Sequence, residues 1–241
     1  MSDSCFFDRL KRKIIVTGHY GSGKTEFAVS LAKLLKSRNS DPKTKDDFNS
    51  VSIIDLDIVN PYFRSREQRV FLENEGISVY GSVYKKEVTA ELPALGASLR
   101  APLESDSCRV IVDAGGNDTG ALVLNQFTKY FIYETDVLAV INANRPDTST
   151  FDTALEHIRA IERITALTIS GLINNTHLLR ETTCADIIKG YALCEKISEA
   201  TGKSLLCNCY PQGLIDTGEL SGLSGSLMPM GLYMRPTWLD K

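Results

Sequence analysis

Gly18-His19-Tyr20-Gly21-Ser22-Gly23-Lys24-Thr25 is the stretch that decides the fold of this 241-residue chain. It satisfies the pattern G-x-x-x-x-G-K-[ST], whose glycines let consecutive backbone N–H groups converge on phosphate oxygens at a helix N-terminus. Ile14-Ile15-Val16 supplies the preceding strand, and Glu26 to Lys36 the following helix. The stretch predicts a phosphate-binding loop in which Lys24 reaches the β- and γ-phosphates and Thr25 binds Mg²⁺. Glu26 joins the loop residues as a predicted nucleotide contact.

Short apolar runs alternate with helical patterns along nearly the whole chain. Such runs, rich in Val and Ile, are typical of strands buried on both faces. Helical spacing between them marks Phe27 to Leu35 and Phe151 to Ile161. The sequence therefore predicts an α/β fold of three layers, with a mostly parallel central sheet flanked by helices and ligands at the carboxyl ends of the strands. The predicted strands are Lys13 to Thr17, Val51 to Leu56, Arg109 to Asp113, Val137 to Asn142, Thr168 to Ile173 and Leu205 to Cys209.

Two of these strands end in carboxylates. The second strand runs into Asp55-Leu56-Asp57, and alternation places both side chains on the same side where the strand leaves the sheet. The third runs into Asp113-Ala114-Gly115-Gly116, in which Asp113 is expected to bind Mg²⁺ through water and the Gly116 N–H to meet the γ-phosphate. Carboxylates at these positions orient a water or hold the magnesium shell. We therefore expect Lys24, Asp57 and Asp113 to carry the chemistry, and Thr25, Asp57 and Asp113 to hold the metal.

These residues together resemble the deviant P-loop ATPases, a superfamily that includes chromosome-partitioning and septum-positioning ATPases, the nitrogenase iron protein, dethiobiotin synthetase and cobyrinic acid amide synthetases. The resemblance covers roughly residues 13 to 212. It implies that Asp57 positions or activates the attacking water, that Asn175 contacts adenine, and that Pro211 lies in a loop bordering the base. The stretches Asp55 to Glu67 and Asn174 to Thr183 most resemble uncharacterised bacterial ATP-binding proteins of this group.

His19 departs from that pattern. The second loop position of most of these ATPases is a lysine that reaches the partner's phosphates across a nucleotide-sandwich dimer. A histidine is shorter and mostly neutral at pH 7. Slow hydrolysis, or a cationic role for Arg64, Arg66 or Arg145, is the consequence that we expect. Of the other two histidines, His157 is expected on the surface of its helix and His177 in a structural role near the base pocket.

The composition of the chain bears on its partners and on its cellular location. A formal net charge of −3 gives no basic field for nucleic acid. No apolar run approaches the length of a membrane span, and Met1 to Lys13 lacks the pattern of a signal peptide. The six scattered cysteines fit free thiols in a cytoplasmic protein. Cys207 and Cys209 are the exception, because two thiols one residue apart on a strand share a face and are candidates for a soft metal.

The expected organisation is one nucleotide-binding domain over residues 1–241, with an irregular insertion around 58–107 and a C-terminal tail from about 213. The leading functional hypothesis is a Mg-ATP-dependent switch that acts as a homodimer or on an unidentified protein partner. Three alternatives stay open. One is an ATP-dependent ligase or kinase for a small molecule, with Tyr62, Arg64, Arg66 and Lys85 binding an anion. Another is a metal-cofactor maturation ATPase. The third is GTP in place of ATP, although Asn174-Asn175-Thr176-His177 lacks the lysine and aspartate of an N-K-x-D guanine motif.

Overall fold

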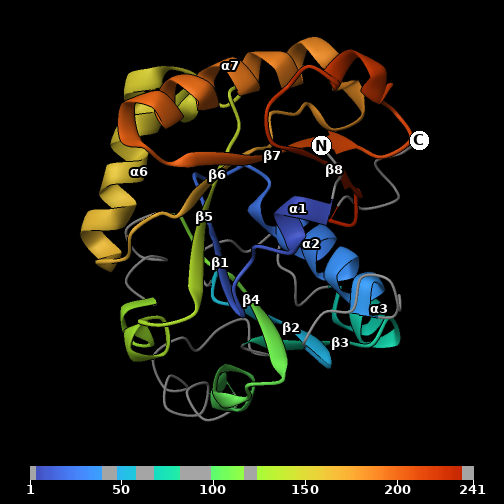
Figure 1. Ribbon diagram of the computed structural model, residues 1–241, viewed down its shortest axis with the longest axis vertical. Helices are drawn as coiled ribbons and strands as arrows, with labels where there is room; N and C mark the ends of the chain where they lie inside the picture. Colours follow the sequence, from blue (N-terminus) through green and yellow to red (C-terminus); the bar gives the residue numbers. More distant parts are fainter. Residues whose placement is uncertain (1–3, 40–47, 58–67, 82–98, 117–123, 235–241) are drawn as a thin grey trace.

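The computed structural model describes residues 4–39, 48–57, 68–81, 99–116 and 124–234. Its centre is an eight-stranded sheet in the order β3-β2-β4-β1-β5-β6-β7-β8 (Figure 1). All seven pairings in this sheet are parallel. The strands are β1 (Lys13–Thr17), β2 (Ser50–Asp55), β3 (Ile77–Gly81), β4 (Cys108–Asp113), β5 (Thr135–Ile141), β6 (Gly171–Asn174), β7 (Ser204–Pro211) and β8 (Ser226–Met230). The predicted parallel α/β fold is confirmed.

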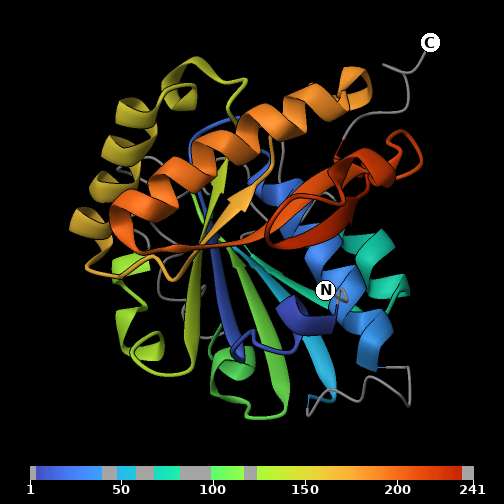
Figure 2. The same cartoon turned by 45° about the horizontal axis from the view of Figure 1, so that its top comes forward.

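Helices cover both faces of this sheet. The helices are α1 (Ser4–Phe7), α2 (Lys24–Asn39), α3 (Arg69–Asn74), α6 (Phe151–Thr165) and α7 (Cys184–Thr201), and residues 99–104 are also helical. One buried cluster joins α1, α2 and α3 to the sheet. The other joins α6, α7 and the helix at 99–104 to the opposite face. In both Figure 1 and Figure 2, α6 and α7 lie apart from α2 and α3.

The main helices follow from local sequence signals. Thr150 caps α6 by accepting a hydrogen bond from the Thr153 N–H. Thr183 and Asp186 form a reciprocal capping box at the start of α7, and Gly202 ends that helix in a left-handed conformation. Short 3-10 turns, η2 (Thr128–Tyr130), η3 (Pro146–Thr148), η4 (Leu179–Glu181) and η5 (Thr217–Leu220), connect the elements. None of the helices described has the length and apolar run that a bilayer crossing requires.

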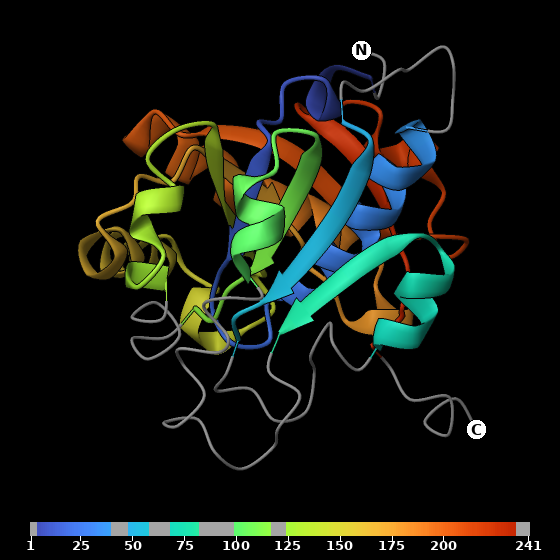
Figure 3. The same ribbon diagram turned by 90° about the horizontal axis from the view of Figure 1, so that it is seen from below.

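Two strands lie where the sequence predicted irregular structure. β3 falls inside the expected insertion around 58–107 and pairs with β2, and Figure 3 shows the two arrowheads pointing the same way. β8 falls in the expected tail and pairs with β7 at the other edge of the sheet. Pro229 within β8 has no N–H to donate, which an edge strand tolerates. The predicted strand over Thr168 to Ile173 is also shorter at its start, because β6 begins at Gly171.

The position of β1 fixes where a ligand fits. β1 lies between β4 and β5, so the chain leaves β1 on one side for β2, β3 and β4, and on the other side for β5 through β8. Crevices open beyond the carboxyl ends of strands at such a switch point. The glycine-rich loop follows β1 at this point, beside the carboxyl ends of β4 and β5.

Candidate nucleotide-binding site

The glycine-rich loop joins β1 to α2. Its glycines Gly18, Gly21 and Gly23 all have positive φ, at 149°, 75° and 82°. At Gly23 a Cβ would also lie 2.4 Å from the Asn175 amide nitrogen and 3.0 Å from the His177 Nε2 atom. Only glycine meets both the backbone and the packing requirement there. The segment after β6, which contains Asn175 and His177, therefore packs against the loop and constrains its backbone.

Lys24 lies folded across this loop. Its side chain is buried, and its Nζ donates a hydrogen bond to the His19 carbonyl at 3.3 Å. An ammonium group that is held by one backbone carbonyl keeps two further donors for an anion. Lys24 thus lies next to the α2 N-terminus, and its contact with the phosphates stays a prediction of the motif.

Strand register brings two carboxylates together beside the loop. Asp55 of β2 pairs in register with Asp113 of β4, which in turn pairs with Val16 just before the loop. Asp113 is fully buried, and neither of its carboxylate oxygens has a hydrogen-bond partner among the described residues. Burial, followed by the negative charge of Asp55, raises the pKa of Asp113 to about 8, against the opposing charge of Lys24. Such a carboxyl is poised to bind a cation.

These groups fit a magnesium ion that takes most of its ligands from water and phosphate. Thr25 lies close enough to lower the pKa of Asp113, although the two are not in regular hydrogen-bond geometry. Asp57 is buried nearby, and its N–H donates to the Asp55 carboxylate at 3.1 Å. No cluster of three or more His, Cys, Asp and Glu side chains suited to a metal exists in the described part of the chain. Mg²⁺ at phosphate sites needs only one or two carboxylates.

Gly116 lies directly against the glycine-rich loop. A Cβ on this residue would be 1.6 Å from the Gly18 carbonyl oxygen and 3.2 Å from the His19 nitrogen. The turn after β4 is therefore packed onto the start of the loop, which only glycine allows. The γ-phosphate contact that the sequence predicts for Gly116 would lie where this turn meets the loop.

His19 contacts its own chain. Its Nε2 lies 3.7 Å from an Asp147 carboxylate oxygen, and its Nδ1 lies 3.1 Å from the Tyr20 carbonyl. Its ring packs edge-on against His157 of α6, with ring centroids 5.1 Å apart. His157 is half-buried, and the solvent-facing position expected for it is not what the structure shows. His19 is thus held in place by Asp147, His157 and the Tyr20 carbonyl.

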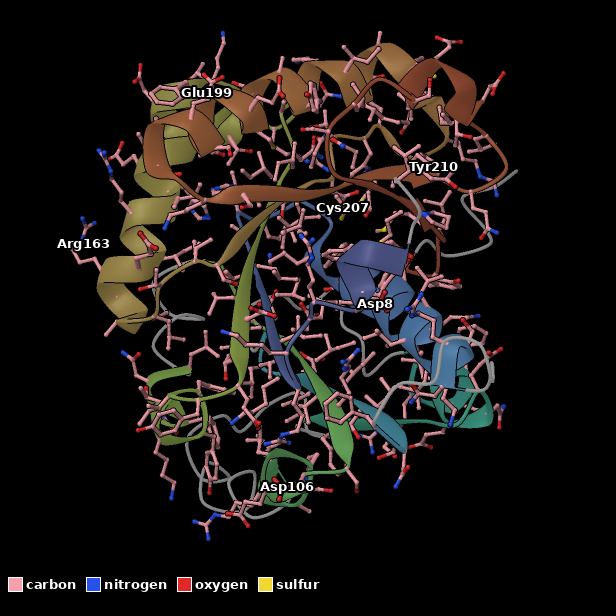
Figure 4. All side chains as sticks on the ribbon, viewed as in Figure 1. Asp8, Asp106, Arg163, Glu199, Cys207 and Tyr210 are labelled. Carbon is pink, nitrogen blue, oxygen red and sulfur yellow. The ribbon has the colours of Figure 1, made fainter. Side chains whose placement is uncertain are left out.

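A pocket of about 420 Å³ opens beside Lys24 and Thr25, toward the ends of β6, β7 and β8. Its size and largely apolar lining suit a small organic ligand. Lining residues that the sequence predicted as nucleotide contacts are Tyr20, Gly21, Gly23, Lys24, Thr25, Glu26, Asn175 and Pro211. Residues that it did not predict are Met230, Gly231, Leu232 and Met234. Tyr210, another lining residue, is labelled in Figure 4 toward the end of β7.

Asn175 and His177 close the loop side of this pocket. The Asn175 amide donates to the Ser22 carbonyl at 2.8 Å, so it supports the glycine-rich loop. His177 accepts a hydrogen bond from the Leu179 N–H at its Nδ1, while its Nε2 is buried without a partner among the described residues. Burial, together with the charge of Arg145, lowers the pKa of His177 to about 4. Its ring is therefore neutral at physiological pH.

Arg145 is one of the three arginines that the sequence proposed as a cationic residue. Its Nε donates to the Gly21 carbonyl at 2.9 Å, and its side chain lines the pocket. Arg145 therefore supplies positive charge next to the loop from the same chain. Arg64 and Arg66 lie outside the described residues, as do Tyr62 and Lys85 of the predicted anion pocket.

Cys207 and Cys209 share one buried face of β7, as predicted (Figure 4 labels Cys207). They pack with Met228 and Met230 of β8 in an apolar cluster. Burial, the neighbouring Cys207 thiol and Cys194 raise the pKa of Cys209 well above its ordinary range. Protonated thiols in apolar surroundings behave as small hydrophobic side chains. This setting does not favour the maturation hypothesis.

Comparisons with known proteins place the fold. No protein-family model matches the sequence, and no curated protein matches it either. The structure is similar to the cell division protein FtsY of Thermotoga maritima (18% identity, TM-score 0.56, 85% of this chain and 67% of that chain). It is similar to FtsY of Mycoplasma mycoides (15%, 0.53, 82% and 59%). It is also similar to the signal recognition particle receptor FtsY of Elizabethkingia anophelis in complex with GDP (16%, 0.52, 85% and 62%).

The chain spans between 59% and 67% of the length of these three proteins. At identities of 15% to 18%, the likeness concerns the architecture. The same architecture follows from the parallel sheet, its strand order and the glycine-rich loop after β1. The chain therefore has the fold of the P-loop nucleoside triphosphatases.

Proposed function

We propose that this protein binds Mg-ATP, hydrolyses it slowly, and uses the nucleotide state as a switch toward a second copy of itself or another protein. The observation that carries the proposal is that the glycine-rich loop and the 420 Å³ pocket share Gly23, Lys24 and Thr25. A phosphate chain on the loop would place its nucleoside in the pocket. The resemblance of the sequence to the deviant P-loop ATPases supports the choice of ATP.

The protein groups divide the chemistry of hydrolysis among them. Lys24 would offset charge on the β- and γ-phosphates, and Asp57 would orient the attacking water. Thr25 and Asp113 would hold Mg²⁺, which when bound neutralises charge between those phosphates. Gly116 supports the switch, because it lies directly against the Gly18 carbonyl. A γ-phosphate bound beside Gly116 would displace the turn after β4, as a γ-phosphate changes the order of switch loops in other nucleotide-controlled proteins.

The pocket favours adenine over guanine. Guanine N1–H and N2–H are donors, and a carboxylate is the usual acceptor for them in the N-K-x-D motif. Among the lining residues that the structure describes, Glu26 is the one carboxylate, and it already accepts the backbone N–H groups of Tyr233 and Met234. Adenine needs no such acceptor. GTP is the alternative, since one structurally similar protein is described in complex with GDP.

Binding measurements test this proposal directly. Isothermal titration of the purified chain with ATP, ADP and GTP in Mg²⁺ should give ATP at least about tenfold tighter than GTP. Lys24→Ala should weaken ATP by about 100-fold, because it removes charge-assisted hydrogen bonds to phosphate. Equal affinity for ATP and GTP would contradict the choice of adenine. ATP binding unaffected by Lys24→Ala would contradict the whole site.

Hydrolysis and switching need separate measurements. Phosphate release from Mg-ATP should be slow in the native chain and absent in Asp57→Ala. Sedimentation with ATP and with ADP should give different oligomeric distributions if a second copy is the partner. Equal release from the native chain and Lys24→Ala would overturn the ATPase claim. Identical sedimentation in both nucleotides would point to another protein as partner.

A further inference from the structure

One wall of the pocket comes from the segment directly after β8. Residues 231–234, here called the C-terminal strap, contribute Gly231, Leu232 and Met234 to the pocket lining. Met230 at the end of β8 and Pro211 at the end of β7 continue the same apolar wall. Apolar side chains of this kind pack against the flat face of a base more readily than against phosphates. The strap thus faces the part of the pocket suited to the nucleoside.

Glu26 ties the strap to the phosphate loop. This residue is in the first turn of α2, immediately after Thr25, and also lines the pocket. Its two carboxylate oxygens accept the backbone N–H groups of Tyr233 and of Met234, the latter at 3.1 Å. The residues joined are more than 200 positions apart in sequence. Burial raises the pKa of Glu26 to about 7, against the two hydrogen bonds from the strap, which lower it because they favour the ionised carboxylate.

Further contacts hold the strap on α2 and α3. The Gly231 N–H donates to the Ser30 hydroxyl at 3.2 Å, and the Gln68 amide donates to the Tyr233 carbonyl at 2.8 Å. The Lys33 ammonium lies 4.9 Å from the centre of the Tyr233 ring. A Cβ on Gly231 would be 2.3 Å from that ring, so a larger residue there would displace the Tyr233 side chain. The strap is docked at both of its ends.

We propose that Glu26 is a positioning residue that holds the C-terminal strap in place as the wall of the nucleoside pocket. The inference rests on the proposed function, because it assigns the pocket to a purine nucleoside. Its consequence is that Glu26 determines affinity for the nucleoside part of the ligand while contributing little to contacts with the phosphates. Lys24, by contrast, would serve the phosphates alone.

The test compares ATP with adenosine. Glu26→Ala should weaken both ligands by about tenfold, because the wall that both share is released. Lys24→Ala should weaken ATP and leave adenosine unchanged. Leu232→Ala, which removes a strap side chain and spares the carboxylate, should also weaken both ligands in parallel. In Glu26→Ala the change in phosphate release should appear mainly as a raised KM for ATP and less as a lowered kcat, since the expected change is in binding.

Glu199→Gln is the matched control. Glu199 is exposed on α7, and Figure 4 places it far from the Tyr210 side of the molecule. Native affinities in Glu26→Ala would overturn the inference. So would a loss for ATP with native affinity for adenosine, because that result would assign Glu26 to the phosphates.

Amide hydrogen exchange separates failure of this inference from failure of the proposed function. The amides of Tyr233 and Met234 should exchange at least about tenfold faster in Glu26→Ala than in the native chain, with or without nucleotide. If the native chain binds neither ATP nor adenosine, the proposed function fails and the exchange rates still report on the strap. Unchanged exchange in Glu26→Ala would show that Glu26 does not hold the strap.

Discussion

The two ends of the parallel sheet both bury charged side chains, but they satisfy them differently. At the amino end, the buried Arg12 guanidinium donates to the carbonyls of Leu103, Ser105 and Cys108 at 2.9, 2.7 and 3.3 Å. Lys13 donates to the Tyr130 carbonyl there. Arg12 and Lys13 therefore each have protein partners that offset the cost of burying a cation.

At the carboxyl end, buried polar atoms lack such partners. Both Asp113 oxygens and the hydroxyls of Thr17 and Ser22 are buried without a hydrogen-bond partner among the described residues. Groups left in this state destabilise a fold unless a ligand completes them. Arg12 and Lys13 therefore stabilise the sheet at its amino end, whereas Asp113 at the carboxyl end is available to a ligand. Mutations at the two ends should therefore separate stability from binding.

Arg12→Met should give the largest effect, on stability. The change leaves three carbonyls without their donor, and the free energy of unfolding should fall by about 4 kcal/mol. The folded fraction should bind ATP normally, since Arg12 is at the far end of the sheet. Chemical denaturation and titration of the same sample measure both quantities. Arg163→Met on the exposed face of α6 is the control, and an equal loss in that variant would remove the distinction between the ends.

Gly116→Ala should show the opposite pattern. The added methyl meets the Gly18 carbonyl, so the turn after β4 or the loop must shift. ATP affinity should drop by about 100-fold, equivalent to about 2.7 kcal/mol, with a smaller change in stability. Gly222→Ala is the matched control, because open space surrounds a Cβ at that position. Native ATP affinity in Gly116→Ala would mean that the turn after β4 does not influence nucleotide binding by the glycine-rich loop.

Sequence reasoning recovered those parts of the molecule that depend on neighbouring residues. The glycine-rich loop, its strand and helix, and the aspartates after β2 and β4 are all local patterns, and the structure brings them together at one edge. β8 was missed because Pro229 and nearby glycines argue against a strand. Its pairing with β7 overrides that local preference.

Contacts across long sequence separations account for the rest. No periodicity links Glu26 to Tyr233, or Arg145 to Gly21, because each pair meets only when the sheet is complete. The same is true of His19 and His157, whose rings meet between the loop and α6. The sequence identified His19 as unusual but could not say where its ring points. Side-chain partners in the candidate site were therefore the least predictable feature.

Asp113→Asn should alter the pH dependence of stability in the nucleotide-free chain. The folded chain holds the Asp113 proton up to about pH 8, whereas the unfolded chain releases it near the ordinary value of 3.8. The free energy of unfolding of the native chain should therefore fall as pH rises between these values, by about 1.4 kcal/mol per pH unit relative to Asp113→Asn. Denaturation at several pH values in EDTA measures this difference. Asp106→Asn at the amino end should track the native curve, and parallel curves for Asp113→Asn would refute the raised pKa.

Arg145→Gln should give the smallest effect, on a neighbouring residue. The Arg145 charge and burial together hold the pKa of His177 near 4. Removing the charge leaves burial in place, so the pKa of His177 should rise but stay below its ordinary value of 6.5. Imidazole NMR signals followed against pH give this pKa directly, and Arg180→Gln, on the exposed turn after His177, controls for loss of a nearby charge. An unchanged His177 pKa would mean that Arg145 serves the Gly21 carbonyl alone. A raised pKa would show that the carboxyl end of the sheet keeps His177 neutral partly through a charge that also supports the phosphate loop.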